Sequence, residues 1–453
     1  MLRGRTVNVA ITPQGSKDVD PSEASAPAQI DLRNGRMSDA GNWNKRFGYK
    51  EHLDLGVKEP IELLIPENGG YAVTESGSVY SLSPTVSYIG DVEGSYRARW
   101  VNTDGKIFIA KGDKPKYIDG SSLVDVDSTN AVWMDVMDNF TILVTQDPQW
   151  YWSAAGSTTL FPDNNFTNTD SDGEIIKHFE VYGRDMYFFK ETKIEVWGNT
   201  GALDQFARRF VIEKGVLSRD SVVQANNTFY FLGHDGDFYS IQQGGAQVIS
   251  DQYRRRIDEI QNREECYGID FRKENVIRWF FPTQGICLTY DYYKNNWSED
   301  NSWRNGDWQL LPINSYMELN NEGFIGDSRP TGKIYKWDRS FKSDNGDPIR
   351  VYRRVRFPLS GTGNKARLNR IQFRAKAIND STLTHHFSWR YNLDNGAWSE
   401  WYLVEMGGPN NWSFYRDFYN FGSGREVEIE IAESDAVDFL LTNLNVTIKA
   451  LGR

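Results

Sequence analysis

Little in this chain supports a disulfide scaffold or a metal centre. The 453 residues include two cysteines, Cys266 and Cys287, and five histidines. Two cysteines cannot build a disulfide framework or a four-cysteine zinc site, and in a reducing compartment we expect both thiols to be free and buried. No histidine has the spacing of a zinc ligand, so we expect them in turns or at the surface: His52, His178, His234, His385 and His386.

Long apolar runs and an excess of basic charge are also missing. No segment approaches the roughly 18 apolar residues that span a bilayer, and the start MLRGRTVNVAITP lacks the apolar stretch of a secretory signal. The chain has 51 basic and 62 acidic residues, a net charge of −11. We therefore expect a protein made in the cytoplasm, with no membrane contact and no general attraction to nucleic acid.

The common catalytic strings are absent too. The sequence contains no G-x-S-x-G, H-E-x-x-H or P-loop motif. Residues 168–173 begin like a calcium-binding loop, but Phe179 stands where the loop needs a bidentate glutamate. We predict no catalytic residue, no cofactor and no metal site.

What the chain does contain is a repeat of roughly 35 to 45 residues. Each unit has about four short apolar-aromatic runs separated by Gly, Asp or Asn turns. The units begin near Ile61, Arg97, Trp133, Ile175, Ser221, Cys266 and Ser315. This pattern predicts an all-β fold, a β-propeller of about seven four-stranded blades, with six or eight blades as alternatives.

Local signals within the units agree with this fold. Asp104-Gly105 separates two apolar runs and predicts a tight hairpin with positive φ at both central positions. Aromatic residues make up 14% of the chain, which suits thin sheets packed face to face. One segment, residues 250–261, predicts a helix instead, with Ser250 as its N-cap.

The repeat ends near Asp347, after which the apolar runs are longer and lack the blade spacing. We predict two domains from this change. The first is the propeller, residues 1–346, including an N-terminal segment that closes the ring. The second is a C-terminal β-sandwich, residues 347–453.

The strongest charge feature lies between Arg339 and Lys376, where eleven basic residues accompany only Asp344 and Asp347. Such a basic surface could contact phosphate or an acidic partner. Its arginines form our candidate partner or subunit interface: Arg350, Arg353, Arg354, Arg356, Arg367, Arg370 and Arg374.

A structural alternative competes with this interface. On the strand predicted at residues 349–357, alternation puts Arg350, Arg354 and Arg356 on one face. A later run alternates Glu426, Glu428 and Glu430 with apolar residues. We favour cross-strand pairing of these arginines with these glutamates over a free basic face.

The segment from Tyr182 to Gln261 carries five short strings in a fixed order: Lys193–Trp197, Asn199–Gly201, Ile212–Gly215, Phe231–Gly233 and Ile249-Ser250. In this order they resemble the packaged-DNA stabilisation, or tail hub, proteins of short-tailed bacteriophages. Looser matches follow at residues 288–299 and 324–338. An early one, Arg46–Lys50, has Phe47 where the family has proline.

The resemblance implies a non-enzymatic structural protein of the virion, located in the phage tail and made in the host cytoplasm. Such proteins form a ring, typically a hexamer, below the portal and the adaptor, or head-to-tail connector. The hub, or nozzle, retains packaged DNA, forms part of the exit channel without sequence-specific DNA binding, and anchors tail fibres, spikes or needle proteins. A polysaccharide-degrading or carbohydrate-binding propeller is the alternative that the sequence leaves open.

Overall fold

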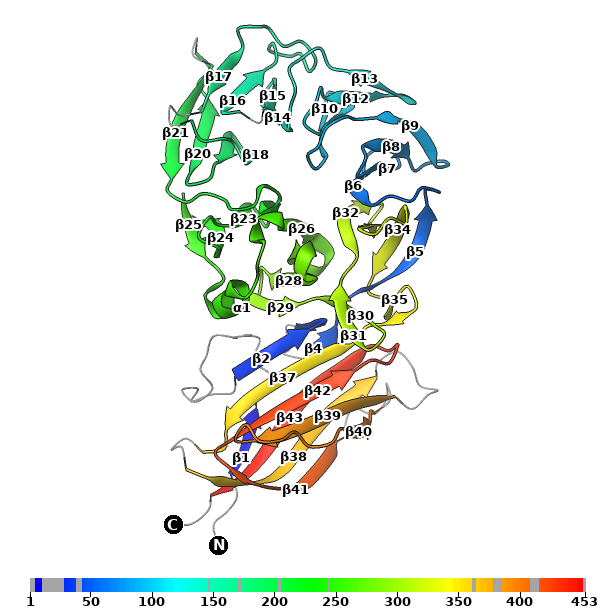
Figure 1. Ribbon diagram of the computed structural model, residues 1–453, viewed down its shortest axis with the longest axis vertical. Helices are drawn as coiled ribbons and strands as arrows, with labels where there is room; N and C mark the ends of the chain where they lie inside the picture. The colour runs from blue at the N-terminus through cyan, green and yellow to red at the C-terminus, as the bar shows by residue number, and fades with distance from the viewer. Residues whose placement is uncertain are drawn as a thin grey trace.

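The computed structural model describes residues 5–9, 28–37, 43–145, 147–169, 173–202, 205–242, 244–360, 364–377, 385–407 and 415–450. These residues form a ring of small sheets and, below it, a pair of sheets with longer strands (Figure 1). None of the helices in this part of the chain has the length and apolarity needed to cross a bilayer.

The ring is a propeller whose first six blades each pair four successive antiparallel strands. Blade 1 contains β6 (Ile61–Ile65), β7 (Tyr71–Thr74), β8 (Ser78–Ser81) and β9 (Ser87–Asp91), and blade 2 contains β10 (Arg99–Thr103), β11 (Lys106–Ala110), β12 (Lys116–Asp119) and β13 (Ser122–Asp125). Blade 3 contains β14 (Trp133–Met137), β15 (Phe140–Val144), β16 (Gln149–Trp152) and β17 (Phe166–Asn168), and blade 4 contains β18 (His178–Tyr182), β19 (Asp185–Phe189), β20 (Ile194–Asn199) and β21 (Phe206–Ile212). Blade 5 contains β22 (Val223–Ala225), β23 (Thr228–Leu232), β24 (Phe238–Gln242) and β25 (Gly245–Val248), and blade 6 contains β26 (Tyr267–Phe271), β27 (Val276–Phe281), β28 (Ile286–Asp291) and β29 (Asn296–Glu299).

Blade 7 takes its outermost strand from a distant part of the chain. It contains β32 (Ile313–Leu319), β33 (Glu322–Asp327), β34 (Lys333–Asp338) and β5 (Gly48–Asp54). β5 pairs antiparallel with β34, so that Tyr49 lies opposite Trp337. Because β5 precedes blade 1 in the chain, this pairing joins the first blade to the last and closes the ring without a covalent link.

A hydrophobic cluster lies between each pair of adjacent blades. Side-chain alternation along the strands feeds two clusters from one strand. On β27, Ile277, Trp279 and Phe281 join the cluster shared with blade 5, whereas Val276 and Phe280 join the one shared with blade 7. Each fully buried Phe or Ile stabilises the fold by roughly 1.5–3 kcal/mol. A blade therefore depends on both of its neighbours.

The predicted units correspond to these seven blades, and local details test the finer predictions. Asp104 and Gly105 have φ values of 51° and 70°, which confirms the predicted hairpin. The predicted helix is much shorter than expected: a 3₁₀ turn, η2 (Asp251–Tyr253), leads into α1 (Arg254–Asp258). Ser250 does not cap it, because its Oγ accepts a hydrogen bond from the amide of Phe238 at 2.9 Å.

The remaining helices are single 3₁₀ turns, and two small hairpins connect the larger elements. The turns are η1 (Arg219–Ser221), η3 (Arg263–Glu265), η4 (Arg272–Glu274) and η5 (Pro282–Gln284). The hairpins are β30 (Asn301–Arg304) with β31 (Asp307–Leu310), and β35 (Ser343–Asp344) with β36 (Asp347–Pro348).

The second body consists of two sheets that share one hydrophobic core. In the β43 sheet the order is β3 (Gly35–Met37), β4 (Trp43–Lys45), β43 (Phe439–Ala450), β38 (Ala366–Ala377) and β41 (Arg416–Gly424), with β1 (Arg5–Val9) also on β43. In the β37 sheet the order is β2 (Ala28–Arg33), β37 (Val351–Pro358), β42 (Glu426–Glu433), β39 (His386–Leu393) and β40 (Tyr402–Glu405). We call this body the two-sheet unit.

The chain division differs from the one predicted. The sequence predicts that residues 1–346 belong to the propeller, but β1, β2, β3 and β4 pair with the strands of the two-sheet unit, and β5 is the N-terminal strand that completes a blade. β2 also meets β29 of blade 6 in a parallel bridge from Arg33 to Glu299. The N-terminal strands therefore connect the two bodies.

Candidate functional site: the junction of the propeller and the two-sheet unit

Buried polar side chains meet where blades 6 and 7 join the two-sheet unit. The central one is Asn34, which lies between β2 and β3 with no exposed surface and a φ of 54°. Its Oδ1 accepts hydrogen bonds from Arg46 Nε and from the amide of Asn301, both at 2.8 Å. Its Nδ2 donates to the carbonyl of Arg350 at 2.8 Å. One side chain thus ties the N-terminal segment, the hairpin that follows blade 6 and the residue before β37 together.

Arg46 forms a fully buried ion pair at this junction. Its two terminal nitrogens donate to Asp344 at 2.9 and 2.6 Å, and neither side chain has exposed surface. Nη2 also donates to the carbonyl of Asn301 at 3.1 Å. Burial alone would lower the pKa of Arg46, but the Asp344 carboxylate raises it above its ordinary value. Burial raises the pKa of Asp344 above its ordinary value, and the Arg46 guanidinium opposes this shift.

A second buried cluster lies around Asp300. This carboxylate accepts from Arg36 Nη1 at 3.0 Å and from Arg278 Nε at 2.8 Å. Arg278 also donates to Glu274 at 2.8 Å. Burial opposes ionisation of Asp300, but Arg36 and Arg278 outweigh it and hold its pKa well below the usual range. The charges in both clusters are paired, which a buried charge requires.

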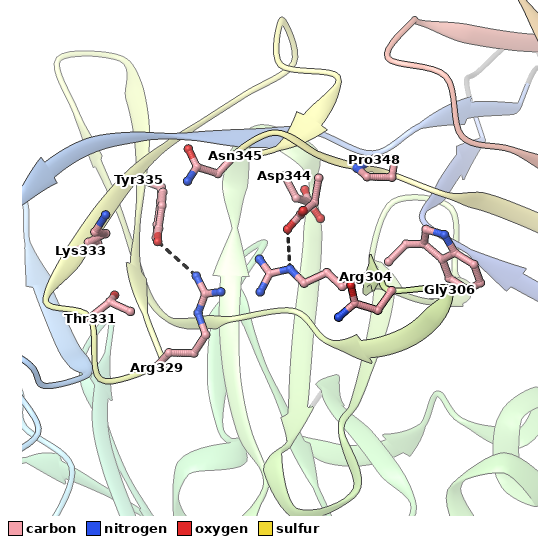
Figure 2. Close-up of a pocket in the computed structure, with 12 residues that line it drawn as sticks. Arg304, Gly306, Arg329, Thr331, Lys333, Tyr335, Asp344, Asn345 and Pro348 are labelled. Atoms are coloured by element: carbon pink, nitrogen blue, oxygen red, sulfur yellow. Dashed lines mark hydrogen bonds and ion pairs between the residues drawn. The ribbon is translucent and has the colours of Figure 1, made fainter.

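A polar cavity of about 690 Å³ opens beside this junction, between blade 7 and the two hairpins (Figure 2). Three cationic side chains line it, and each has a carboxylate partner. Arg304 pairs with Asp347 at 2.6 Å, Arg329 with Asp327 at 2.8 Å, and Lys333 with Glu51 at 2.7 Å. Arg329 also donates to the Tyr335 hydroxyl at 3.2 Å. The cavity is therefore charge-balanced, and it holds no unpaired cation for an anionic substrate.

A second cavity, of about 540 Å³, occupies the centre of the ring. The inner strands of blades 1, 2, 4, 5, 6 and 7 line it, with charged residues of both signs: Glu62, Arg97, Arg99, Glu180, Asp270, Arg272 and Glu318. Burial raises the pKa of Asp270 to about 6. Glu62 forms an ion pair with Lys111, and Arg97 donates to Asn314 at 2.8 Å. The first contact joins blades 1 and 2, and the second joins the start of blade 2 to blade 7.

The structure divides the seven candidate interface arginines among three places. Arg350, Arg354 and Arg356 lie on the outer face of the β37 sheet, Arg367, Arg370 and Arg374 lie on the β43 sheet, and Arg353 lies in the core between them. The sequence therefore grouped residues that tertiary structure separates.

The predicted arginine–glutamate pairing is confirmed on the β37 sheet. Arg354 donates to Glu428 at 2.6 Å, and Arg356 bonds the same carboxylate. Glu430 accepts from Arg390 of β39 at 2.5 Å. Both glutamates are buried, and the hydrogen bonds from Arg354 and its neighbours lower the pKa of Glu428 against the opposing effect of burial. Arg350 instead lies over the ring of Trp303, 4.5 Å from its centroid.

The sequence predicts Arg353 among the interface arginines, but 3% of its surface is exposed. Within the described part of the chain, its Nε and Nη1 have no hydrogen-bond partner, and its guanidinium lies 5.9 Å from the ring of Trp43. Burial lowers its pKa to about 9. The same alternation that points Arg354 outward points Arg353 inward, so it cannot contact a partner.

The side chains that commonly bind metals, His, Cys, Asp and Glu, do not form a cluster among the described residues. Over the residues that the structure describes, no three His, Cys, Asp or Glu side chains gather as metal ligands; residues 170–172 of the calcium-loop-like segment lie outside them. Cys266 and Cys287 are free and buried, as predicted. His178 differs from the prediction: it is buried, 3.2 Å from Glu180 and 3.0 Å from the carbonyl of Arg219, and burial lowers its pKa.

Comparison with known families decides what this architecture belongs to. A family model described as bacteriophage P22 Gp10, beta-propeller, matches residues 67–303, which is more than half of the chain. The chain belongs to this family. It is a bacteriophage structural protein of the virion, and the resemblance found in the sequence is confirmed. A search among curated proteins finds no match.

Solved propellers from other sources resemble this phage protein weakly. BamB from Moraxella catarrhalis is 11% identical, with a TM-score of 0.42 over 75% of this chain and 100% of that one. The Pan2 WD40 domain of Neurospora crassa is 8% identical, with a TM-score of 0.41 over 67% and 97% of the two chains. At these TM-scores the likenesses carry no functional conclusion.

Proposed function

We propose that this phage protein is the tail hub, or nozzle, which forms a ring below the portal and the adaptor and retains the packaged DNA. The observation that carries the proposal is the family match, which runs from β7 of blade 1 through blade 6 and leaves β6 and blade 7 outside. The hub would anchor tail fibres, spikes or needle proteins and assemble as a hexamer.

The junction supports a mechanical role. A protein that withstands pressure from packaged DNA must not bend between its two bodies. Here the Arg46–Asp344 pair, the Asp300 cluster and Asn34 connect them through buried, charge-assisted hydrogen bonds. Closure of the ring by β5 adds a backbone connection between the same N-terminal segment and blade 7.

The central cavity bears on where the DNA would pass. At about 540 Å³ it has the size of a small-molecule site, not of a conduit for a duplex. Its opening is also bridged by contacts such as Arg97 with Asn314. DNA would therefore pass between several copies of the chain, around a shared axis, and not through one propeller. The net charge of −11 would weaken adhesion of the phosphates to that channel.

Electron cryo-microscopy of the intact phage particle tests this proposal. We expect six copies around the tail axis, directly below the adaptor, with the propellers at equal distance from the axis. A location at the tip of a peripheral spike, or absence from the particle, would contradict it. Release of reducing sugar from host surface polysaccharide by the purified protein would favour the polysaccharide-degrading alternative instead.

A further inference from the structure

The outer face of the β43 sheet is an exposed basic surface in an acidic protein. It lies on β38, β41 and β43, at the end of the molecule opposite the propeller (Figure 1). Four cationic side chains point outward from it: Arg367, Arg370, Arg374 and Lys449. Over the described outward positions of these three strands, Asp417 is the one carboxylate.

Strand register shows that these side chains share one face. Arg367 lies opposite Lys449 on one side and Ser423 on the other, and Arg370 lies opposite Thr447 and Tyr419. Between these rows and Arg374, Asn445 donates to Gln372 at 2.9 Å, and Gln372 donates to Asp417 at 2.9 Å. A row of uncharged and anionic groups thus divides the cationic residues.

Two tyrosines extend this surface. Tyr419 has 59% of its surface exposed and Tyr415 has 40%. The Arg374 guanidinium lies 5.2 Å from the centroid of Tyr415, and Arg370 lies 3.8 Å from Asp417. These contacts hold flexible side chains in defined positions before any partner arrives, which reduces the entropy cost of binding.

We propose that this surface, which we call the tyrosine–arginine face, docks an acidic surface of another virion protein. Its composition is that of a protein interface, where tyrosine and arginine are enriched and carry most of the binding free energy. The four cations give it charge complementarity to a partner rich in Asp and Glu.

Two other occupants fit less well. A DNA backbone would bring phosphates against Asp417 in the middle of the face, and four cations would make few phosphate contacts. A second copy in a two-fold contact would set four cations against four cations, because such contacts are self-complementary. A head-to-tail contact with the next copy in a ring is a separate outcome, which the cross-linking test distinguishes. An acidic protein meets the face without either conflict.

Cross-linking in the particle tests which partner occupies the face. Tyr419 is replaced by p-benzoylphenylalanine, and particles are irradiated and digested for mass spectrometry. We expect a cross-link to an Asp- and Glu-rich peptide of a different virion protein. A cross-link to DNA or to a second copy of this chain would overturn the proposal, as would the absence of any cross-link in particles that contain the protein.

Charge reversal on the face tests its role, and charge reversal on the propeller is the matched control. In Arg367→Glu/Arg374→Glu, we expect the cross-link to fall roughly tenfold, because reversed charges repel an acidic partner. Arg184→Glu/Lys114→Glu reverses two cations on the propeller, where the Arg184 side chain is 79% exposed, and should leave the cross-link unchanged. Equal cross-linking in both double variants would contradict the proposal.

The inference rests on the proposed hub function, because it takes the partner to be a virion protein. A measurement on the purified protein tests the tyrosine–arginine face independently of that function. Fluorescence anisotropy with labelled poly-L-glutamate at physiological ionic strength should give a Kd that rises roughly tenfold in Arg367→Glu/Arg374→Glu and stays unchanged in the propeller variant. Labelled duplex DNA is measured in the same way. If it binds more tightly than poly-L-glutamate and its Kd also rises in Arg367→Glu/Arg374→Glu, the face binds DNA and the proposal is overturned. Thermal unfolding checks that both variants are folded.

Discussion

Arg46 binds Asp344 through both terminal guanidinium nitrogens, across 298 positions of the chain and with no exposed surface on either side chain. The pair joins the segment before β5 to the hairpin that leads into β37. It therefore fixes the chain both where it enters the propeller and where it leaves it.

Asp344→Asn should destabilise the protein strongly, because it leaves the Arg46 guanidinium buried without a countercharge. Breaking a buried ion pair from one side costs about 3–5 kcal/mol. Guanidinium unfolding monitored by tryptophan fluorescence measures the change. Lys333→Ala is the control: its pair with Glu51 is partly exposed, 31% and 41%, and its loss should leave the unfolding midpoint nearly unchanged. Equal effects of the two substitutions would contradict our description of the junction.

Asp300 should make the protein sensitive to acid. Its pKa is lowered in the folded state from the ordinary 3.8, so its stabilisation is complete at neutral pH and declines as the pH falls below that value. Asp300→Asn removes this contribution. The free-energy difference between wild type and variant should be largest at pH 7 and shrink in acid, measured by denaturant unfolding across that range. A difference that does not change with pH would rule out this role.

Arg353→Met should leave the protein as stable as wild type or make it more stable. The wild-type guanidinium is buried, and its Nε and Nη1 lack partners among the described residues, whereas Met fills a similar volume with no charge to desolvate. Thermal unfolding of both proteins checks this. A loss above about 1.5 kcal/mol, the usual limit for a volume-conserving core change, would mean that Arg353 has a binding partner in the folded protein.

Glu428→Lys should abolish stable folding of the two-sheet unit, because it places a third cation beside Arg354 and Arg356. Glu428→Gln keeps the shape and should cost about 1–3 kcal/mol, which keeps the test informative when the lysine variant does not fold. Glu405→Lys, at a side chain 50% exposed, should change stability by less than about 1 kcal/mol. Limited proteolysis and circular dichroism distinguish these outcomes.

The sequence alone determined the propeller, because its blades are built from neighbouring strands. Period-two alternation and turns such as Asp104-Gly105 are local signals, and each blade from 1 to 6 pairs four consecutive strands. The repeat therefore located all seven units. The alternation of Glu426, Glu428 and Glu430 likewise predicted their pairing with arginines correctly, since strand alternation sets which side chains share a face.

Only the tertiary structure decided the rest, because those contacts join distant residues whose register no local signal sets. No sequence pattern predicts that Arg46 pairs with Asp344. The sequence places Arg353 and Arg354 in one basic group, and the structure shows that they lie on opposite faces of β37. The N-terminal strands could have joined either body, since a strand's partner is chosen by its packing and not by its own pattern. Packing placed them in the two-sheet unit, in which Tyr415 and Tyr419 of the tyrosine–arginine face are exposed.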